Sequence, residues 1–209
     1  MCRCGCCFKK DEPFLTYKEI YAGDNYLLKI SIVGPPQAGK SCLLRTLAGE
    51  DWSGPYVETI GVDFRTLRSV AAADPSDGAE SAATAQLQLW DTAGSPRFDK
   101  LVGSYIRTCF SGAIIAFDAT SADSLGSVRS YWLGQVEAHA PPGAVRLLVG
   151  MKADLADCEG SVCSEAQSFA HAHGMRFVLL SSSDPTAARA ALESLVREIV
   201  ARLAARTRR

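Results

Sequence analysis

The stretch Val33–Ser41, VGPPQAGKS, follows the apolar run 26–32 and opens a segment whose apolar residues recur at helical spacing. Residues 34–41 match the pattern G-x-x-x-x-G-K-S, in which a glycine-rich loop joins a strand to a helix. In such a loop, backbone N–H groups at the helix N-terminus surround phosphate groups. Lys40 then places a positive charge beside the β- and γ-phosphates, and the Ser41 hydroxyl is a ligand for Mg²⁺. The stretch therefore predicts a nucleotide-phosphate loop.

Outside this loop, apolar runs typical of strands alternate with helical patterns. This alternation predicts βαβ units, a mostly parallel sheet and helices on both faces. The link between 62–70 and 87–91 has no room for a crossover helix, so these two strands should pair as an antiparallel edge hairpin. The expected fold class is α/β with a six-stranded, mostly parallel sheet. Further strands are expected at 26–33, 112–118, 145–150 and 175–181, and helices at 39–48, 124–140, 164–174 and 186–206.

One domain accounts for most of the 209 residues, because a chain of this length with 47% hydrophobic residues can bury a single core. We place this domain at 26–205, with residues 69–85 as a flexible hairpin insertion. Residues 1–25 form a cysteine-rich extension, and 206–209 form a short basic tail. The net charge of −1 argues against nucleic acid as a partner, and no apolar run has the roughly 18–20 residues of a membrane-spanning helix.

A second motif, LQLWDTAG at 87–94, ends a predicted strand in Asp91. In parallel sheets, ligands bind at the carboxyl ends of the strands, so Asp91 should face the phosphate loop as a carboxylate on the Mg²⁺ side. Gly94 could bring a backbone N–H to a γ-phosphate. Alone, the motif could be a strand-ending turn, but after a phosphate loop it supports a nucleotide site.

Four segments together resemble the Rab family of Ras-superfamily small GTPases. They are GKSCLLRTLA (39–48), YVETIGVDFRT (56–66), LQLWDTAG (87–94) and PRF (96–98), and the similarity runs over about 26–202. The resemblance implies a P-loop G domain that binds GTP or GDP with Mg²⁺ and hydrolyses GTP. It also implies effector, exchange and activating proteins as partners, and we expect a monomer.

The resemblance assigns roles to loop residues. Thr59 matches the switch I threonine that completes Mg²⁺ coordination and senses the γ-phosphate, while Trp52 stands where an aromatic packs against guanine. Tyr56 occupies another aromatic position of switch I, and ordinary packing under a loop is the alternative for both aromatics. In the family, the N–H groups that bind the phosphates come mainly from the later part of the loop. Pro35 and Pro36 lack an N–H, but they lie before that part in this chain. The expected phosphate ligands are Gly34, Gln37, Ala38, Gly39, Lys40, Ser41, Cys42 and Gly94, and the expected Mg²⁺ ligands are Ser41, Thr59 and, through water, Asp91.

The base-recognition motifs depart from the family pattern N-K-x-D, because the chain has M-K-A-D there. Asp154 keeps the carboxylate that accepts from guanine N1–H and the exocyclic amine, and Lys152 keeps the stem that lies along the base. Met151 cannot donate the hydrogen bond of the usual asparagine, so we expect weaker affinity with guanine preference kept. S-S-S replaces S-A-K, and the backbone N–H of Ser182, which follows Ser181, can still address the guanine carbonyl.

The catalytic position departs as well, since Ser95 replaces the glutamine that orients the attacking water in the family. A serine side chain is shorter, and Pro96 restricts the backbone beside it. Pro36 takes the place of a small residue where an activating arginine would enter. The catalytic candidates are therefore Lys40, Gly94 and an impaired Ser95, and we expect slow hydrolysis.

Four of the eight cysteines, Cys2, Cys4, Cys6 and Cys7, lie in the first seven residues, and the others are expected in the core. We interpret the four as S-acylated, because two or more acyl chains give stable membrane attachment. Metal binding and a tail without special role are the alternatives. The end ARTRR has no cysteine for the prenyl anchor usual in Rab proteins. We expect the protein on the cytoplasmic face of an intracellular or plasma membrane.

The favoured function is a membrane-tethered, Rab-like GTPase that switches effector binding in vesicle or membrane trafficking. Two alternatives stay open. A pseudo-GTPase scaffold held in one nucleotide state would fit Met151 and Ser95, whereas Lys40, Thr59 and Asp154 argue against lost binding. Another P-loop enzyme, such as a small-molecule kinase, would need an acceptor site and a lid, and TIGVDF with WDTAG argues against it.

Overall fold

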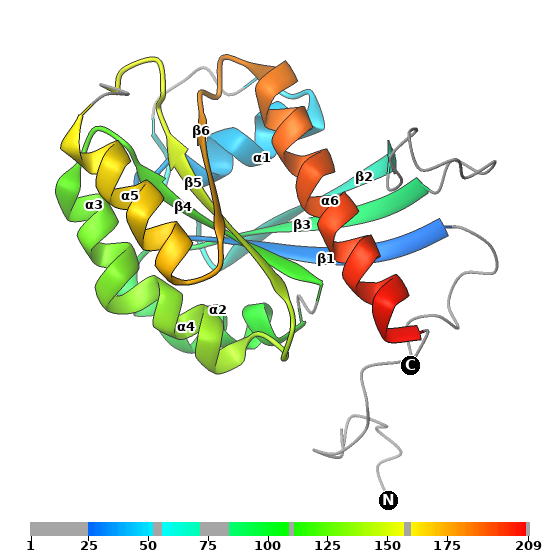
Figure 1. Cartoon of the computed structure of the whole chain (residues 1–209). Coiled ribbons are helices and arrows are strands. Elements are labelled where there is room, and N and C mark those ends of the chain that lie inside the picture. Colours follow the sequence, from blue (N-terminus) through cyan, green and yellow to red (C-terminus); the bar gives the residue numbers. More distant parts are fainter. Residues whose placement is uncertain (1–24, 52–55, 72–83, 109–110, 157–159, 208–209) are drawn as a thin grey trace, which may run out of the picture.

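The computed structural model of the chain describes residues 25–51, 56–71, 84–108, 111–156 and 160–207. Six strands form one sheet in the order β2-β3-β1-β4-β5-β6 (Figure 1). The strands are β1 (Asn25–Val33), β2 (Val62–Ala71), β3 (Thr84–Thr92), β4 (Gly112–Asp118), β5 (Val145–Met151) and β6 (Arg176–Leu180). β2 and β3 are antiparallel and all other neighbours are parallel, which confirms the predicted α/β fold with its antiparallel edge pair.

Helices cover both faces of this sheet, as the sequence predicts. They are α1 (Lys40–Ala48), η3 (Pro96–Phe98), α2 (Asp99–Thr108), α3 (Ala122–Ser127), η4 (Val128–Trp132), α4 (Leu133–His139), α5 (Ser161–Ala172) and α6 (Pro185–Thr207). One hydrophobic cluster joins the sheet to α1 and α6, and a second joins the other face to α2, α3, η4, α4 and α5. The fold is therefore a three-layer α/β/α arrangement.

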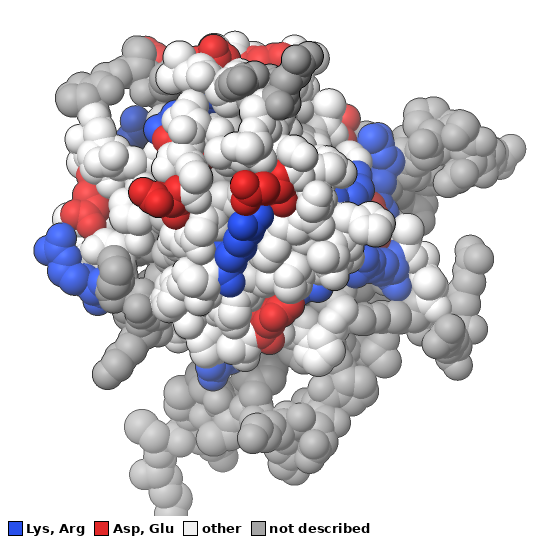
Figure 2. All heavy atoms as spheres, turned by 60° about the vertical axis from the view of Figure 1, so that its left-hand side comes forward, with Lys and Arg blue, Asp and Glu red and all other residues white. Residues whose placement is uncertain are grey.

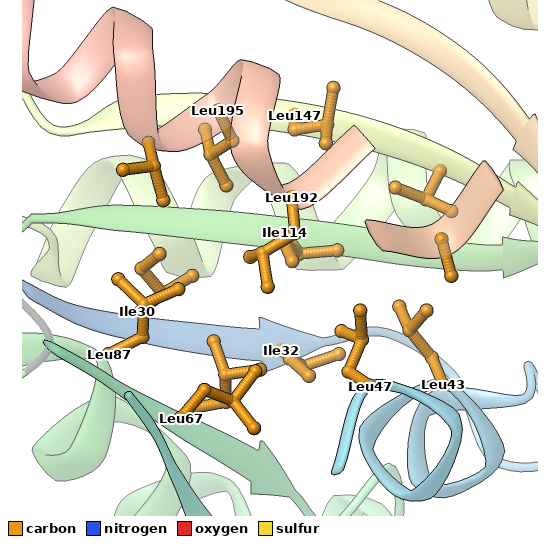
Figure 3. Close-up of a cluster of buried hydrophobic side chains, with 14 of the residues drawn as sticks. Ile30, Ile32, Leu43, Leu47, Leu67, Leu87, Ile114, Leu147, Leu192 and Leu195 are labelled. Atoms are coloured by element: carbon orange, nitrogen blue, oxygen red, sulfur yellow. The ribbon is translucent and has the colours of Figure 1, made fainter. Parts of the chain in front are cut away.

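The central strand β1 positions the phosphate loop because it is anchored on both faces. Ile30 and Ile32 are buried under α1 and α6, among Leu192 and Leu195 (Figure 3). Val33, the last residue of β1, belongs to the opposite cluster. The loop that follows Val33 therefore leaves from a fixed point at the carboxyl edge of the sheet.

Several elements differ from the expected ones. The run 124–140, predicted as one helix, consists of α3, η4 and α4 in succession, and η4 is a π-helical turn. Helix α2 is not among the helices expected from the sequence. Strands β2 and β3 also extend into the ends of the expected insertion 69–85, where Val70 pairs with Ala85. Residues 72–83 lie outside the described part of the chain.

The surface and the remaining cysteines add three details. Of the four cysteines expected in the core, Cys163 is buried, whereas Cys42 is only partly buried because it lies beside the phosphate loop. Cys109 and Cys158 lie outside the described residues. On the face turned forward in Figure 2, acidic and basic side chains lie next to one another. Among the described residues, no helix is both long and apolar enough to cross a membrane.

Candidate functional site

Lys40 is the centre of the phosphate loop. Its Nζ donates hydrogen bonds to the carbonyl oxygens of Gly34, at 2.8 Å, and Pro35, at 2.7 Å. Burial lowers the pKa of Lys40 to about 8, against the raising effect of Asp91. Gly34 has to be glycine, because a Cβ there would lie 2.0 Å from the carbonyl oxygen of Ala116 in β4. The loop thus holds its own ammonium group in place beside the N-terminus of α1.

The two prolines of this loop differ in their surroundings. Pro35 is buried and supplies the carbonyl that Lys40 contacts, whereas Pro36 is exposed. After them, Gln37 has φ 60° and Gly39 has φ 92°, both in the left-handed region. Gly39 caps α1, and its carbonyl accepts the N–H of Leu43 at 2.9 Å. These turns leave the N–H groups after the prolines at the start of α1, and helix N-termini are favourable sites for phosphate groups in proteins.

Three oxygen-bearing side chains converge beside this loop. Ser41 Oγ donates to Asp91 Oδ2 at 2.5 Å and lies 3.0 Å from Thr59 Oγ1. Thr59 Oγ1 donates to the same Asp91 oxygen at 3.4 Å. Burial raises the pKa of Asp91 to about 6, against the hydrogen bond from Ser41, and Asp91 Oδ1 is buried without a hydrogen-bond partner among the described residues. Hard oxygen ligands with a spare carboxylate oxygen fit Mg²⁺, so the residues expected as its ligands are suited to it.

Gly94 brings the strand-ending motif of β3 against the phosphate loop. A Cβ on Gly94 would lie 2.6 Å from the backbone nitrogen of Pro36 and 2.7 Å from Lys40 Nζ. The preceding residue, Ala93, donates its N–H to the Gly61 carbonyl at 2.9 Å, which ties this motif to the segment before β2. Only a residue without a side chain allows the two backbones to approach this closely.

A second link joins the same two segments at the surface. Arg97 lies 3.6 Å from Glu58, next to Thr59, in an exposed ion pair. Ser95, the candidate for water orientation, is buried, and its carbonyl accepts the N–H of Phe98 at 3.0 Å. The serine is therefore held inside the turn that begins η3.

The base loop follows β5. Lys152 has φ 64°, and its Nζ lies 2.5 Å from Asp118 Oδ2 in an ion pair. Burial by itself would raise the pKa of Asp118, but hydrogen bonds from Lys152 and Thr120 outweigh it, so this pKa lies below its usual value. Asp154 is exposed at the surface of the loop, and the N–H of the intervening Ala153 donates to the Leu180 carbonyl at 3.1 Å.

The loop after β6 closes the base side. Thr46 of α1 donates its hydroxyl to the Ser182 carbonyl at 2.9 Å. Ser181 Oγ lies 2.5 Å from Ser183 Oγ and also accepts the Ser183 N–H. Because Ser181 and Ser182 belong to a loop fastened to α1, the base loops and the phosphate loop lie at the same edge of the sheet.

The structure places the expected phosphate residues beside the expected Mg²⁺ ligands, and the loops with the expected base residues lie at the same edge of the sheet. Tyr56 is 60% exposed, so it is available at the surface rather than packed under a loop. Trp52 lies outside the described residues, and so do Cys2, Cys4, Cys6 and Cys7. Their predicted roles stay predictions.

An aromatic cluster next to the site was not predicted. Phe64 of β2 stacks on Trp90 of β3 with ring centroids 5.4 Å apart, and Tyr105 of α2 lies 5.9 Å from Trp90. Phe64 and the nearby Ile60 are 51% and 83% exposed. Phe64 and Trp90 are directly opposite each other in the register of β2 and β3. Cross-strand pairing of these two aromatic residues is the feature from which the cluster could have been predicted.

The similarity to known proteins extends over all the described residues of this site. A model of the Ras family matches residues 29–201. "Ras-related protein Rab-1D" of Dictyostelium discoideum is 35% identical over 180 residues, which cover 86% of this chain and 83% of the relative. "GTP-binding protein ypt1" of Schizosaccharomyces pombe is 36% identical over 179 residues, with the same coverage. "GTP-binding protein YPT1" of Saccharomyces cerevisiae is 36% identical over 175 residues, covering 84% and 80%.

Proposed function

This chain belongs to the Ras family and is Rab-like, and from that premise we propose that it is a slowly hydrolysing GTP switch in membrane trafficking. The observation that carries the proposal is the convergence of Ser41, Thr59 and Asp91 beside Lys40. These side chains come from separate segments of the chain, and together they are suited to bind a nucleoside phosphate with its metal ion.

The phosphate groups bind to the N–H groups of the loop after Pro36 and to the ammonium of Lys40. Ser41, Thr59 and Asp91 would hold Mg²⁺, because their oxygen atoms converge beside this loop. The bound ion would supply positive charge next to the phosphate oxygens during phosphoryl transfer. Thr59 and Gly94 can sense the γ-phosphate because each lies in a segment that contacts the phosphate loop. Loss of that phosphate on hydrolysis releases both segments.

Guanine is selected by the carboxylate of Asp154, with Lys152 along the base. The ion pair with Asp118 supports Lys152 in this position. An adenine base offers no N1–H and no exocyclic 2-amine, so it would leave the carboxylate unpaired, which costs affinity. The protein therefore prefers guanine nucleotides over adenine nucleotides.

Hydrolysis is slow because no amide side chain stands at the catalytic position. Water attacks the γ-phosphorus, the bond to the bridging oxygen breaks, and GDP and phosphate leave. The Ser95 side chain is short and buried, so it orients that water poorly. The exposed ring of Pro36 obstructs the entry of an activating arginine.

Effector proteins dock on the aromatic cluster of Phe64, Trp90 and Tyr105. Its rings lie on β2, β3 and α2, and β2 and β3 are continuous with the segments that contain Thr59 and Gly94. Phe64 is exposed, Trp90 and Tyr105 are half-buried, and aromatic side chains are enriched at protein interfaces. Exchange factors act on the same nucleotide site, and acyl chains on the N-terminal cysteines hold the protein on the cytoplasmic face of a membrane.

Equilibrium binding of GTP, GDP and ATP, with and without Mg²⁺, tests the proposal. We expect both guanine nucleotides to bind, GTP more tightly with Mg²⁺ and ATP at least about a hundredfold more weakly. Lys40→Met should abolish binding without loss of fold. Absence of guanine-nucleotide binding in the unchanged chain would leave the pseudo-GTPase scaffold as the function, which Met151 at the base motif favours.

A further inference from the structure

Met151, the last residue of β5, lies between the phosphate and base parts of the nucleotide site. Its side chain is 0% exposed, and its carbonyl accepts the N–H of Ala119 at 3.0 Å. In the sheet it is paired with Asp118 of β4 and Leu180 of β6. The base loop starts at the next residue, Lys152, so any displacement of Met151 reaches that loop directly.

The Met151 side chain also contacts the phosphate loop. A Cβ on Gly39 would lie 3.2 Å from Cβ, 3.4 Å from Cγ and 3.5 Å from Cε of Met151, so the thioether chain lies along this glycine. Gly39 has φ 92° and caps α1. The left-handed turn at Gly39 sets the direction of the N–H groups that follow, including that of Ser41. Met151 therefore supports the turn that presents N–H groups to a phosphate.

We propose that Met151 is a positioning residue whose apolar packing on Gly39 holds the phosphate loop in its binding geometry. On this account, the grip on the β-phosphate depends on the volume of the side chain at 151 and not on a hydrogen bond from it. The inference rests on the proposed function, because it concerns the same nucleotide site. It reverses the expectation that the loss of asparagine at this position only weakens binding.

The surroundings of Met151 favour packing over hydrogen bonding. The residue belongs to the hydrophobic cluster between the sheet, α1 and α6. Methionine fills irregular gaps with a flexible chain, and an empty volume would lose its contacts with Gly39. Asparagine would be too short to fill the gap and would bury an amide that needs partners. Restoring asparagine should therefore loosen the phosphate loop.

The test measures GDP and GMP affinities of the full chain by calorimetry, because their ratio reports the grip on the β-phosphate. For Met151→Ala we expect GDP affinity to fall about tenfold or more and GMP affinity to fall less than about threefold. Met151→Leu should keep the ratio within about threefold, since these side chains have similar volumes. Met151→Asn should behave as Met151→Ala does.

A matched control comes from a second buried methionine, Met175. Met175→Ala removes the same atoms from a residue that is 6% exposed in the opposite cluster, and it should leave the GDP/GMP ratio unchanged. The inference is overturned if Met151→Ala lowers both affinities equally, or if Met151→Asn raises them. Binding of neither nucleotide by the unchanged chain overturns the proposed function together with the inference, whereas GDP binding with an unaffected ratio overturns the inference alone.

Discussion

At the scale of single residues, Gly94 gives the sharpest prediction. In Gly94→Ala the new methyl group would overlap the backbone of Pro36, and no side-chain rotation relieves a clash with backbone. We expect affinity for a non-hydrolysable GTP analogue with Mg²⁺ to fall about tenfold or more relative to GDP affinity. Gly126→Ala is the matched control, because no atom in the described part of the chain lies within 4 Å of a Cβ there. Equal losses of affinity for the GTP analogue and for GDP would contradict the close approach of Gly94 to the phosphate loop.

The Asp118 carboxylate should make a part of the free energy of unfolding depend on pH. Its pKa is lower in the folded protein than in the unfolded chain, so its contribution is present above the unfolded pKa of about 4 and is lost as pH falls through the lowered value. With saturating GDP, Asp118→Asn should reduce the free energy of unfolding by about 1 kcal/mol at neutral pH. Urea unfolding from pH 7 to pH 3 should show the difference shrinking below about pH 4. A difference that grows towards acid would contradict this assignment.

How much of the site could be predicted depends on the separation of its residues. The phosphate loop follows from residues 34–41 alone, because its chemistry is local, and Asp91 follows from its place at a strand end. The contact between Gly39 and Met151 joins positions 112 apart in sequence, and no spacing rule predicts it. No spacing rule predicts the ion pair between Lys152 and Asp118 either.

At the scale of elements, α6 packs together with α1 on one face of the sheet. Leu195 is fully buried among β-strand residues, and Leu203 of the same helix is 37% exposed. Leu195→Ala should lower the free energy of unfolding by about 3 kcal/mol, because it leaves a cavity. Leu203→Ala should lower it by about 1 kcal/mol or less, because part of this side chain is already in contact with water. Similar values from urea unfolding of the two variants would contradict the position of α6.

The elements that were not predicted have weak local signals. Helix α2 follows directly on η3 and contains Gly103, which is unfavourable in a helix interior. It is held by packing: Val102 and Ile106 are buried in the second cluster. The π turn η4 has the same apolar spacing as its α-helical neighbours, so periodicity cannot distinguish it.

At the scale of the whole molecule, we propose that acyl chains on the N-terminal cysteines attach the protein to a membrane. Changing Cys2, Cys4, Cys6 and Cys7 together to serine should move a tagged protein from the membrane pellet to the soluble fraction, because the acyl chains are lost. Hydroxylamine, which cleaves thioesters, should release the unchanged protein in the same way. Retention in the pellet after both treatments would remove the acyl anchor from the account.

The most direct test of the account is a single-turnover assay on GTP-loaded protein, started with Mg²⁺ and followed by phosphate release. Ser95→Gln, made in parallel, restores the amide that orients water. The account predicts stable GTP loading of both proteins and hydrolysis in the unchanged chain at least about tenfold slower than in Ser95→Gln. Hydrolysis by the unchanged chain as fast as by Ser95→Gln, or failure of either protein to hold GTP, would contradict it.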